Sequence, residues 1–580
     1  MLRELILCSQ GKIPADIVIK NVRIINVFSK TIFDGDIAIK GKYIARVGNC
    51  DDIIGDLTKV FDGKSMYAAP GFIDAHVHVE SSLLCPTQFA RAIIPHGTAA
   101  IITDFHELGN VLGVRGLHLM LDEARKLPVK IFVMAPSCVP AAPNIDTSGA
   151  EIRPEDIAEL LKDDMVLGLG ELMNFPGVLD VNENVLQKIA LAEKAKKIID
   201  GHAPLLSGST LQAYISAGIL TDHESTTEHE AVEKLHLGMY LLVRQGTVAR
   251  DIGVLKRVIS EKLPLDRCIL VTDDKHVDDI LENGHLEPVL RTAIELGVDP
   301  IEAIRMVTLN VSTAYGLRRL GALSPGYYAD VVLFENLEDV HVKAVFLNGE
   351  LVARDGKLLI NLEQYKYPDW ALKTMRLAKE VSEDELTIRA CADKVKIRLI
   401  VAREGSVVTD CHIEEVETKN CIIEPDPERD ILEIVVAERH KATGNIGKGF
   451  VRGFGLKRGA IGSSVAHDSH NIIAVGANRR DLAEAINAVA KIQGGLVVVD
   501  NGKVRAKLEL PLAGLMSLEE PHRVSERLKK VIQAAKDLGA ELENPFMVLS
   551  FMALPVIPKL KITDKGLFDV DRFSYVPLIV

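Results

Sequence analysis

Histidines and carboxylates at the ends of short apolar runs constrain the fold more than any other feature of this chain. They are His76, His78, Glu171, His202, His223 and Asp273. Each closely follows residues typical of a buried strand. The carboxyl ends of the strands in a parallel barrel open on one common face, so residues distant in sequence can converge there. Several histidines and carboxylates at one opening predict a two-metal hydrolytic site.

Strand-like and helix-like segments alternate over residues 73–315. The candidate strands are 72–78, 98–104, 129–135, 166–171, 198–202, 218–223, 239–243 and 268–273, and helical stretches such as Glu183–Lys197 separate most of them. Strands that alternate with helices pair in parallel, and these units predict an α/β fold containing a (β/α)₈ barrel.

The two flanks of the barrel carry alternating apolar runs with glycine-rich turns, at 16–72 and again at 321–357. A small β-sandwich domain assembled from residues 1–72 and 316–365 explains both, and two unrelated hairpins are the alternative. Residues 366–580 predict a C-terminal α+β domain. Its helices are expected at Trp370–Glu385 and Asp481–Ile492, with strands at 395–400, 431–436 and 496–500.

Composition narrows the class of protein. The 580 residues carry a formal net charge of −13, which argues against a nucleic-acid partner over most of the surface. The eight cysteines form no CxxC pair, as expected for free thiols in a reducing compartment. No apolar run reaches membrane-spanning length, and residues 1–15 lack a signal-peptide core. We therefore expect a cytoplasmic enzyme with no membrane partner.

The chemistry of the strand-end residues supports distinct roles. His76 and His78 are two residues apart, so on a strand both imidazoles would share one face and form half of a metal site. The carboxylate of Glu171 can bridge two cations. Asp273 can bind a metal and take a proton from water, whereas Asp274 would point elsewhere and be structural. Structural histidines and strand-end ion pairs are the alternatives.

Longer motifs resemble a known family. The run Pro70–His78 resembles the first-strand signature of the amidohydrolase superfamily. A closer resemblance, covering nearly the whole chain, is to the bacterial and archaeal adenine deaminases. It rests on motifs that include His78–Ser82, Pro95–Thr98, His106–Glu107, Gly201–Pro204, Asp222–Glu224 and Gly462–Asn471.

This resemblance implies hydrolysis of adenine to hypoxanthine and ammonia, a purine-salvage reaction, by a metal-activated hydroxide. The cofactor would be two Mn²⁺ ions per subunit, with Fe²⁺ or Zn²⁺ possible. His76 and His78 would hold one ion and His202 and His223 the other, with Glu171 as the bridge and Asp273 as the acid/base. The resemblance also implies a homo-oligomer, for which we expect a dimer.

Two positions depart from the family pattern. Phe105 stands where the family usually has proline, and Gln245 where it usually has glutamate. Further polar residues could bind the substrate or form a structural network; they are Glu80, His106, Glu107, Glu224, His467 and His470. The loop 462–471 would either close over the barrel mouth or form a hydrogen-bonded turn.

Two other functions are open from the sequence. One is hydrolysis of a cyclic amide, as in dihydropyrimidinase-like relatives, and the other is a catalytically silent metal-binding scaffold. The bridge separates the first from adenine deamination, because most two-metal amidohydrolases use a carboxylated lysine where this chain has Glu171. The complete set of ligand-type residues argues against the second.

Overall fold

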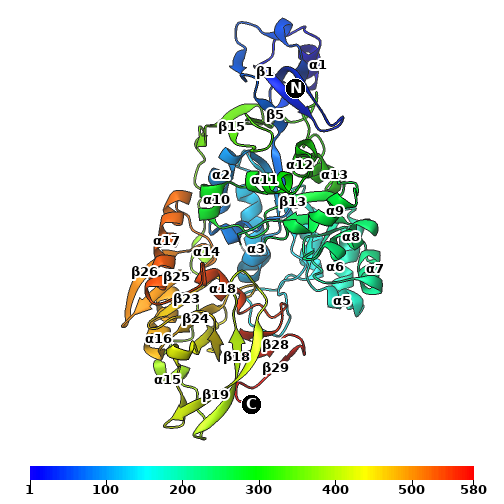
Figure 1. The fold of residues 1–580 in the computed structure, drawn as a ribbon. Helices are drawn as coiled ribbons and strands as arrows, with labels where there is room; N and C mark the ends of the chain where they lie inside the picture. Colours follow the sequence, from blue (N-terminus) through cyan, green and yellow to red (C-terminus); the bar gives the residue numbers. More distant parts are fainter. Residues whose placement is uncertain (248) are drawn as a thin grey trace.

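The computed structural model describes residues 1–247 and 249–580. The N-terminus and a β-sheet lie at one end of the molecule, parallel strands and helices occupy the middle, and the C-terminal region lies at the opposite end (Figure 1). In the described part of the chain, no helix combines the length and apolar character that crossing a bilayer requires.

Each of the expected strands of the central region forms, several of them shorter than predicted. β6–β10 make a five-stranded sheet and β11–β13 a three-stranded sheet, with every pair parallel. The strands are β6 (Phe72–Asp74), β7 (Thr98–Thr103), β8 (Lys130–Ala135), β9 (Val166–Leu172), β10 (Ile198–Gly201), β11 (Thr221–Asp222), β12 (Tyr240–Arg244) and β13 (Cys268–Val271). Every residue of β7 is buried, as expected when helices cover a parallel sheet.

Backbone hydrogen bonds join the two sheets at both edges. The Leu220 N–H donates to Ile199 O at 3.0 Å, between β10 and β11. At the other edge Val77 pairs in parallel with Asp273, and the Asp273 N–H donates to His76 O at 2.9 Å. The first and last parallel strands are therefore neighbours, which brings their following residues together.

Helices separate these strands along the chain. The longer ones are α2 (Pro86–Ile93), α3 (His106–Ala124), α6 (Glu183–Lys194), α7 (Gly208–Ser216), α8 (Glu228–His236) and α11 (Glu287–Glu295). Shorter ones are α4 (Pro154–Leu160), α5 (Phe175–Leu179), α9 (Leu255–Ser260), α10 (Val277–Asn283), α12 (Pro300–Met306) and α13 (Leu309–Ala314). The side chain of Asn182 caps α6 by accepting the Val185 N–H, which fixes the start of that helix.

One nine-stranded sheet collects strands from both flanks of the central region. β5 (Tyr67–Pro70) pairs with β1 (Ile17–Asn26) on one side and with β14 (Val331–Phe334) on the other. The remaining strands are β2 (Thr31–Lys40), β3 (Tyr43–Gly48), β4 (Lys59–Asp62), β15 (Val342–Leu347), β16 (Glu350–Arg354) and β17 (Lys357–Leu358). Side chains of β1–β3, β14 and β15 share one apolar cluster, so distant segments bury a common surface. α1 (Leu2–Ser9) packs beside β3.

The C-terminal region contains a second nine-stranded sheet. Its strands are β18 (Lys394–Val401), β19 (Asp410–Lys419), β20 (Ile422–Ile423), β21 (Leu432–Ala437), β22 (Ile446–Arg452), β23 (Ala460–Ser463), β24 (Ile472–Gly476), β25 (Gly495–Asp500) and β26 (Lys503–Glu509). α16 (Arg479–Lys491) packs on β23–β25 through alanine, leucine and isoleucine side chains. α17 (Pro521–Asp537), α18 (Pro545–Phe551) and the small sheet of β27 (Leu560–Thr563), β28 (Gly566–Asp569) and β29 (Ser574–Tyr575) complete it.

The helix expected at Trp370–Glu385 was wrong. Only two short helices form there, α14 (Asp369–Leu372) and α15 (Glu383–Leu386). Between them the backbone is bonded to distant parts of the chain: the Arg376 N–H donates to Arg439 O at 2.8 Å and the Val381 N–H to Asn487 Oδ1 at 2.9 Å. These tertiary bonds replace the local bonds of a helix.

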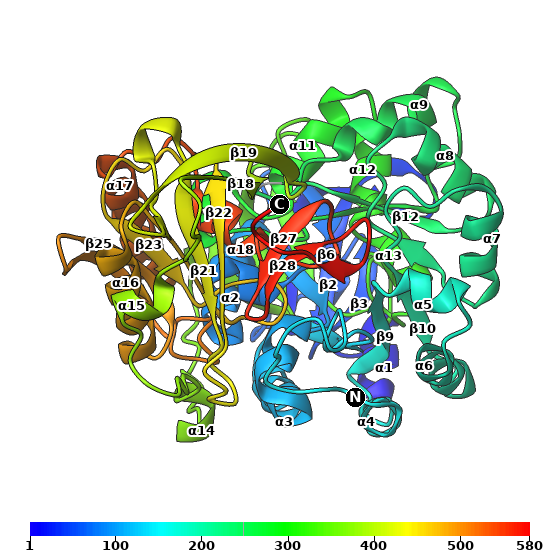
Figure 2. The ribbon, with the colours of Figure 1, turned by 90° about the horizontal axis from the view of Figure 1, so that it is seen from below.

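The C-terminal region lies against the end of the parallel strands where their carboxyl termini meet. In the view from below, β27 and β28 cross in front of these strands (Figure 2). Hydrogen bonds anchor the contact: Asp564 accepts the Thr147 N–H at 3.0 Å, and Lys565 Nζ donates to Asn144 O at 2.9 Å. The loop after β8 is therefore one of the segments that the C-terminal region contacts.

Candidate metal centre and active site

The strand-end residues converge as the topology predicts. Glu171 lies in β9, while His202, His223 and Asp273 lie just beyond β10, β11 and β13. Gly168 lets β9 lie close to the adjacent strand β10, because a Cβ at this position would lie 2.0 Å from Ile198 O of β10. The placement of His76 and His78 on a regular strand was wrong, since β6 ends at Asp74. They belong instead to the irregular stretch that pairs with Asp273.

Glu171 lies at the centre of the histidines. Its Oε2 is 2.8 Å from His202 Nδ1 and 3.2 Å from His223 Nε2, whereas its Oε1 is 3.5 Å from His78 Nε2. The two carboxylate oxygens thus face different imidazoles, as a carboxylate bridging two cations requires. Burial raises the pKa of Glu171, but His202 and His223 hold it well below its usual range.

His76 and His78 face Asp273. Its Oδ1 lies 3.3 Å from His78 Nε2 and 3.7 Å from His76 Nε2. The His76 ring also stacks on His223 with centroids 3.9 Å apart. Burial, with His223 and His78 adding to it, lowers the pKa of His76 to about 3, which keeps this imidazole neutral. A neutral imidazole beside an ionised carboxylate is the protonation state of a metal ligand.

The donor set fits metal ions. His76 Nε2 and His78 Nδ1 are buried and have no hydrogen-bond partner among the described residues. A buried polar atom without a partner is costly, and a metal–nitrogen bond would satisfy it. Ligand-type atoms gather within 4.8 Å of one another in the groups His76–His78–Asp273, His76–Glu171–His223 and His202–His223–Glu224.

Asp104 is a site residue that was not predicted from the sequence. It groups with His78, His106 and Glu171, and its Oδ1 is 2.9 Å from His106 Nδ1 and 3.5 Å from His78 Nδ1. The signal was present, because Asp104 directly follows β7 as the other ligand-type residues follow their strands. Burial raises its pKa, but the neighbouring His106 and His78 hold that pKa well below its usual range, so the carboxylate is ionised.

Phe105, which replaces the usual proline, has a left-handed backbone with φ of 51°. Proline is fixed near −65° and cannot adopt this conformation. The side chain is fully buried in the core, so packing offsets the backbone cost. The turn that presents Asp104 and His106 therefore has its own conformation in this chain. Gln245, the other departure, does not line the cavity described below.

A cavity above these groups is shared by the parallel strands and the C-terminal region. From the strand ends it is lined by His78, His106, Glu107, Glu171, Met173, His202, His223, Glu224, Arg244, Ala249, Asp273 and Asp274. From the C-terminal region it is lined by Val407, His467, Asp468, Met547, Phe551, Leu554 and Ile557. The sequence offered no signal for the apolar half of this lining, or for Arg244.

The predicted substrate residues divide between the cavity and its surroundings. Glu107, His106, Glu224 and His467 line the cavity; Glu80 and His470 do not. Glu80 Oε1 accepts the Leu108 N–H at 3.1 Å, and its Oε2 is buried without a partner among the described residues. Burial raises the pKa of Glu80 to about 7.

The loop 462–471 reaches the strand ends through its two histidines. His467 Nδ1 bonds one carboxylate oxygen of Glu107, and His470 Nε2 bonds the other. All three side chains are buried. Asp274, expected to be structural, accepts a hydrogen bond from Ser81 Oγ and also lines the cavity. Glu107 thus connects the central region to the C-terminal loop.

Known proteins resemble this chain along most of its length. Residues 67–352 match the amidohydrolase family, and residues 406–574 match the adenine deaminase C-terminal domain. An adenine deaminase of Desulfatibacillum aliphaticivorans is 45% identical over 575 residues, covering 99% of this chain and 99% of that protein. One of Archaeoglobus fulgidus is 44% identical over 578 residues, covering 100% and 98%.

The chain belongs to the adenine deaminase family. Solved structures with similarity include an adenine deaminase at 18% identity and a TM-score of 0.45, covering 58% of this chain and 99% of that one. A beta-aspartyl dipeptidase from Fervidobacterium islandicum AW-1 is 17% identical, with a TM-score of 0.47 and coverage of 60% and 99%. Membership of the adenine deaminase family, within the amidohydrolases, implies a divalent metal, for which the groups around Glu171 provide candidate ligands.

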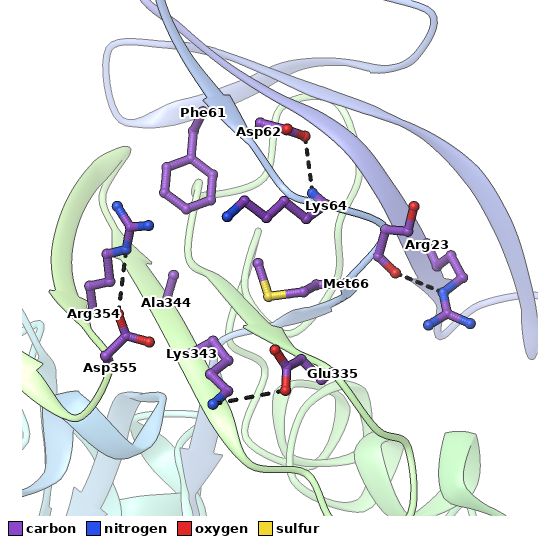
Figure 3. A pocket seen from close by; sticks show the side chains of 11 residues that line it. Arg23, Phe61, Asp62, Lys64, Met66, Glu335, Lys343, Ala344, Arg354 and Asp355 are labelled. Carbon is purple, nitrogen blue, oxygen red and sulfur yellow. Dashed lines mark hydrogen bonds and ion pairs between the residues drawn. The ribbon is translucent and has the colours of Figure 1, made fainter.

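A different hollow, of about 350 Å³, lies on the flank sheet of this adenine deaminase family member (Figure 3). Its charged groups pair locally: Lys343 Nζ lies 3.8 Å from Glu335 and Arg354 Nε 3.6 Å from Asp355. It is lined by carboxylates but by no histidine, so it lacks the imidazole ligands of the strand-end cluster.

Proposed function

We propose that this chain hydrolyses adenine to hypoxanthine and ammonia at the cavity beside Glu171. The proposal rests on the similarity of this chain to adenine deaminases over nearly its whole length. The similarity includes the C-terminal region, which lines part of the cavity. A cyclic amide hydrolase of the dihydropyrimidinase type would have a carboxylated lysine as its bridge, and the corresponding residue here is Glu171.

The architecture we propose is a (β/α)₈ barrel of residues 73–315, with a small β-domain from 1–72 and 316–365 and a C-terminal α+β domain of 366–580. The parallel pairing, and the bond between the first and last strands, support the barrel. The sheet that joins β5 to β14 supports the split domain. All strands of this split domain belong to one continuous sheet. The proposed β-sandwich would therefore be this single sheet, folded around the apolar cluster of its own side chains.

We propose two Mn²⁺ ions, with Fe²⁺ or Zn²⁺ as alternatives. His76, His78 and Asp273 would hold one, His202 and His223 the other, and Glu171 would bridge them. The two Glu171 oxygens, which face different imidazoles, and the partnerless Nε2 of His76 support this. When bound, such ions supply Lewis acidity that makes hydroxide accessible near neutral pH.

The protein's own groups would orient the substrate and move protons. Asp273 Oδ1 is turned into the cluster, where it would accept a proton from water and return it toward the ring or the leaving amine. Glu107, His106, Glu224 and His467 line the cavity and would bind the edge of the base. The C-terminal residues above them would exclude bulk water from the reacting centre.

We further propose a cytoplasmic enzyme of purine salvage that forms homo-oligomers. All eight cysteines are free thiols, which supports a reducing compartment. The family resemblance supports the salvage role and the oligomer, with a dimer as the expected form.

The test is the release of ammonia and hypoxanthine from adenine by purified, Mn²⁺-loaded protein. A panel of other purines and cyclic amides, dihydrouracil among them, is assayed alongside. We expect turnover of adenine above every other compound. Turnover of a cyclic amide but not of adenine would contradict the proposal.

A further inference from the structure

The cavity has two chemically different walls. Toward the strand ends its lining is mostly histidines and carboxylates, whereas α18 and the residues around it contribute Val407, Met547, Phe551, Leu554 and Ile557. We call these five residues the roof. A flat heteroaromatic base has polar edges and apolar faces, so it matches a site with one polar wall and one apolar wall.

Phe551 is the aromatic member of the roof and the last residue of α18. Its ring stacks on the imidazole of His467, with centroids 4.6 Å apart and planes inclined by 17°. His467 is in turn bonded to Glu107 of the central region. The plane of the Phe551 ring is therefore fixed relative to the strand ends.

Lys561 supports the roof from behind. It lies in β27, has 0% exposure, and donates from Nζ to Val407 O at 2.8 Å and to Phe551 O at 3.0 Å. Both acceptors belong to roof residues, and they come from segments about 140 residues apart. Phe551 O lies at the carboxyl end of α18, where a cation is also favoured by the helix dipole.

Burying an ammonium group is costly, and no carboxylate among the described residues compensates for the charge of Lys561. Burial alone lowers its pKa to about 7, and no acidic neighbour counteracts it. Hydrogen bonds to two carbonyls are the interactions that offset the lost hydration. Their effect is local, because they join the loop at Val407 to the end of α18.

We propose that Lys561 is a positioning residue for the substrate, which holds Val407 and Phe551 so that the roof packs against the face of the purine ring. This inference rests on the proposed function. It assigns to the C-terminal region a part in binding the base, beyond covering the cavity.

Kinetics of Lys561→Met test the inference, since methionine keeps the length and apolar stem of the side chain while removing both hydrogen bonds. We expect KM for adenine to rise about tenfold, the order of affinity that a stacked aromatic face contributes to a base. The value of kcat per bound metal should stay within about threefold of the wild type. A lysine with only a structural role would give the opposite split, a lower active fraction with unchanged KM, and that result would overturn the inference.

Lys448→Met is the matched control. Lys448 Nζ also donates to two backbone carbonyls, Glu385 O at 2.9 Å and Thr387 O at 3.2 Å, but neither residue lines the cavity. Its KM should equal that of the wild type, and an equal rise in both variants would overturn the inference.

Phe551→Leu provides a second route should Lys561→Met fail to fold. It removes the aromatic face and leaves the Lys561 bonds in place, so KM should again rise about tenfold, and an unchanged KM would overturn the inference. Absence of adenine turnover by the wild-type protein is a separate outcome, which overturns the proposed function and this inference with it.

Discussion

Arg244 Nη1 donates to Asp273 Oδ2 at 3.0 Å, while Asp273 Oδ1 faces His78 and His76. The two oxygens of this carboxylate are thus separated in role, one held by the guanidinium and the other turned into the cluster. Arg244 is itself fixed by Asp251, whose Oδ2 accepts from its Nε at 2.7 Å. The arrangement orients the proposed base and keeps it charged.

Removing the guanidinium should shift the pH dependence of the reaction. Burial raises the pKa of Asp273, but His78 and the Arg244 charge hold it well below its usual range. In Arg244→Met that pKa rises, so the ionised base is lost at a higher pH as the solution is acidified. The acid limb of kcat/KM should therefore move to higher pH. Arg250→Met, which removes an exposed arginine nearby, is the control. If the acid limb lies at the same pH in both variants, this role of Arg244 is refuted.

Asp273→Asn should separate proton transfer from metal retention. Asparagine keeps an oxygen where the carboxylate has one but cannot accept the proton. We expect metal content to survive largely and kcat to fall about 10²-fold or more, the usual effect of losing a general base. Metal analysis and steady-state kinetics on the same preparation measure both. If kcat is retained and only KM rises, Asp273 binds the substrate and another group is the base.

The two histidines that pair with Glu107 should differ in their effect on activity. His467→Ala removes a cavity wall and the partner of the Phe551 ring, so kcat/KM for adenine should fall about tenfold or more. His470→Ala keeps the cavity wall intact but leaves one buried oxygen of Glu107 without a hydrogen-bond partner. The stability of the protein should therefore fall more than kcat/KM does. His118→Ala, in an exposed histidine, is the control. Wild-type kcat/KM and metal content in both variants would make the loop structural only.

The sequence was informative where local pattern and topology act together. Most strands of the central region have an apolar run, and because the ends of parallel strands share one face, Glu171, His202, His223 and Asp273 lie together. The same rule applied to the end of β7 would have found Asp104. The missing helix at Trp370–Glu385 could not be predicted, because Arg439 and Asn487, distant in sequence, bind that backbone.

The roof could not be predicted from the sequence either. Met547 and Phe551 are ordinary core residues by type, and only the docking of the C-terminal region places them over the strand ends. In the sequence, nothing distinguishes Lys561 from the other lysines. Its burial and its two carbonyl partners follow from the packing of β27 behind α18.

A Mn²⁺ titration of metal-free wild-type protein and Glu171→Ala, following bound metal and adenine turnover together, tests the central claim most directly. The wild type should regain activity in proportion to bound metal, up to about two equivalents per chain. Glu171→Ala should bind less metal and remain nearly inactive, because both sets of histidines lose the carboxylate between them. Two full equivalents in Glu171→Ala together with near-normal turnover would contradict the account.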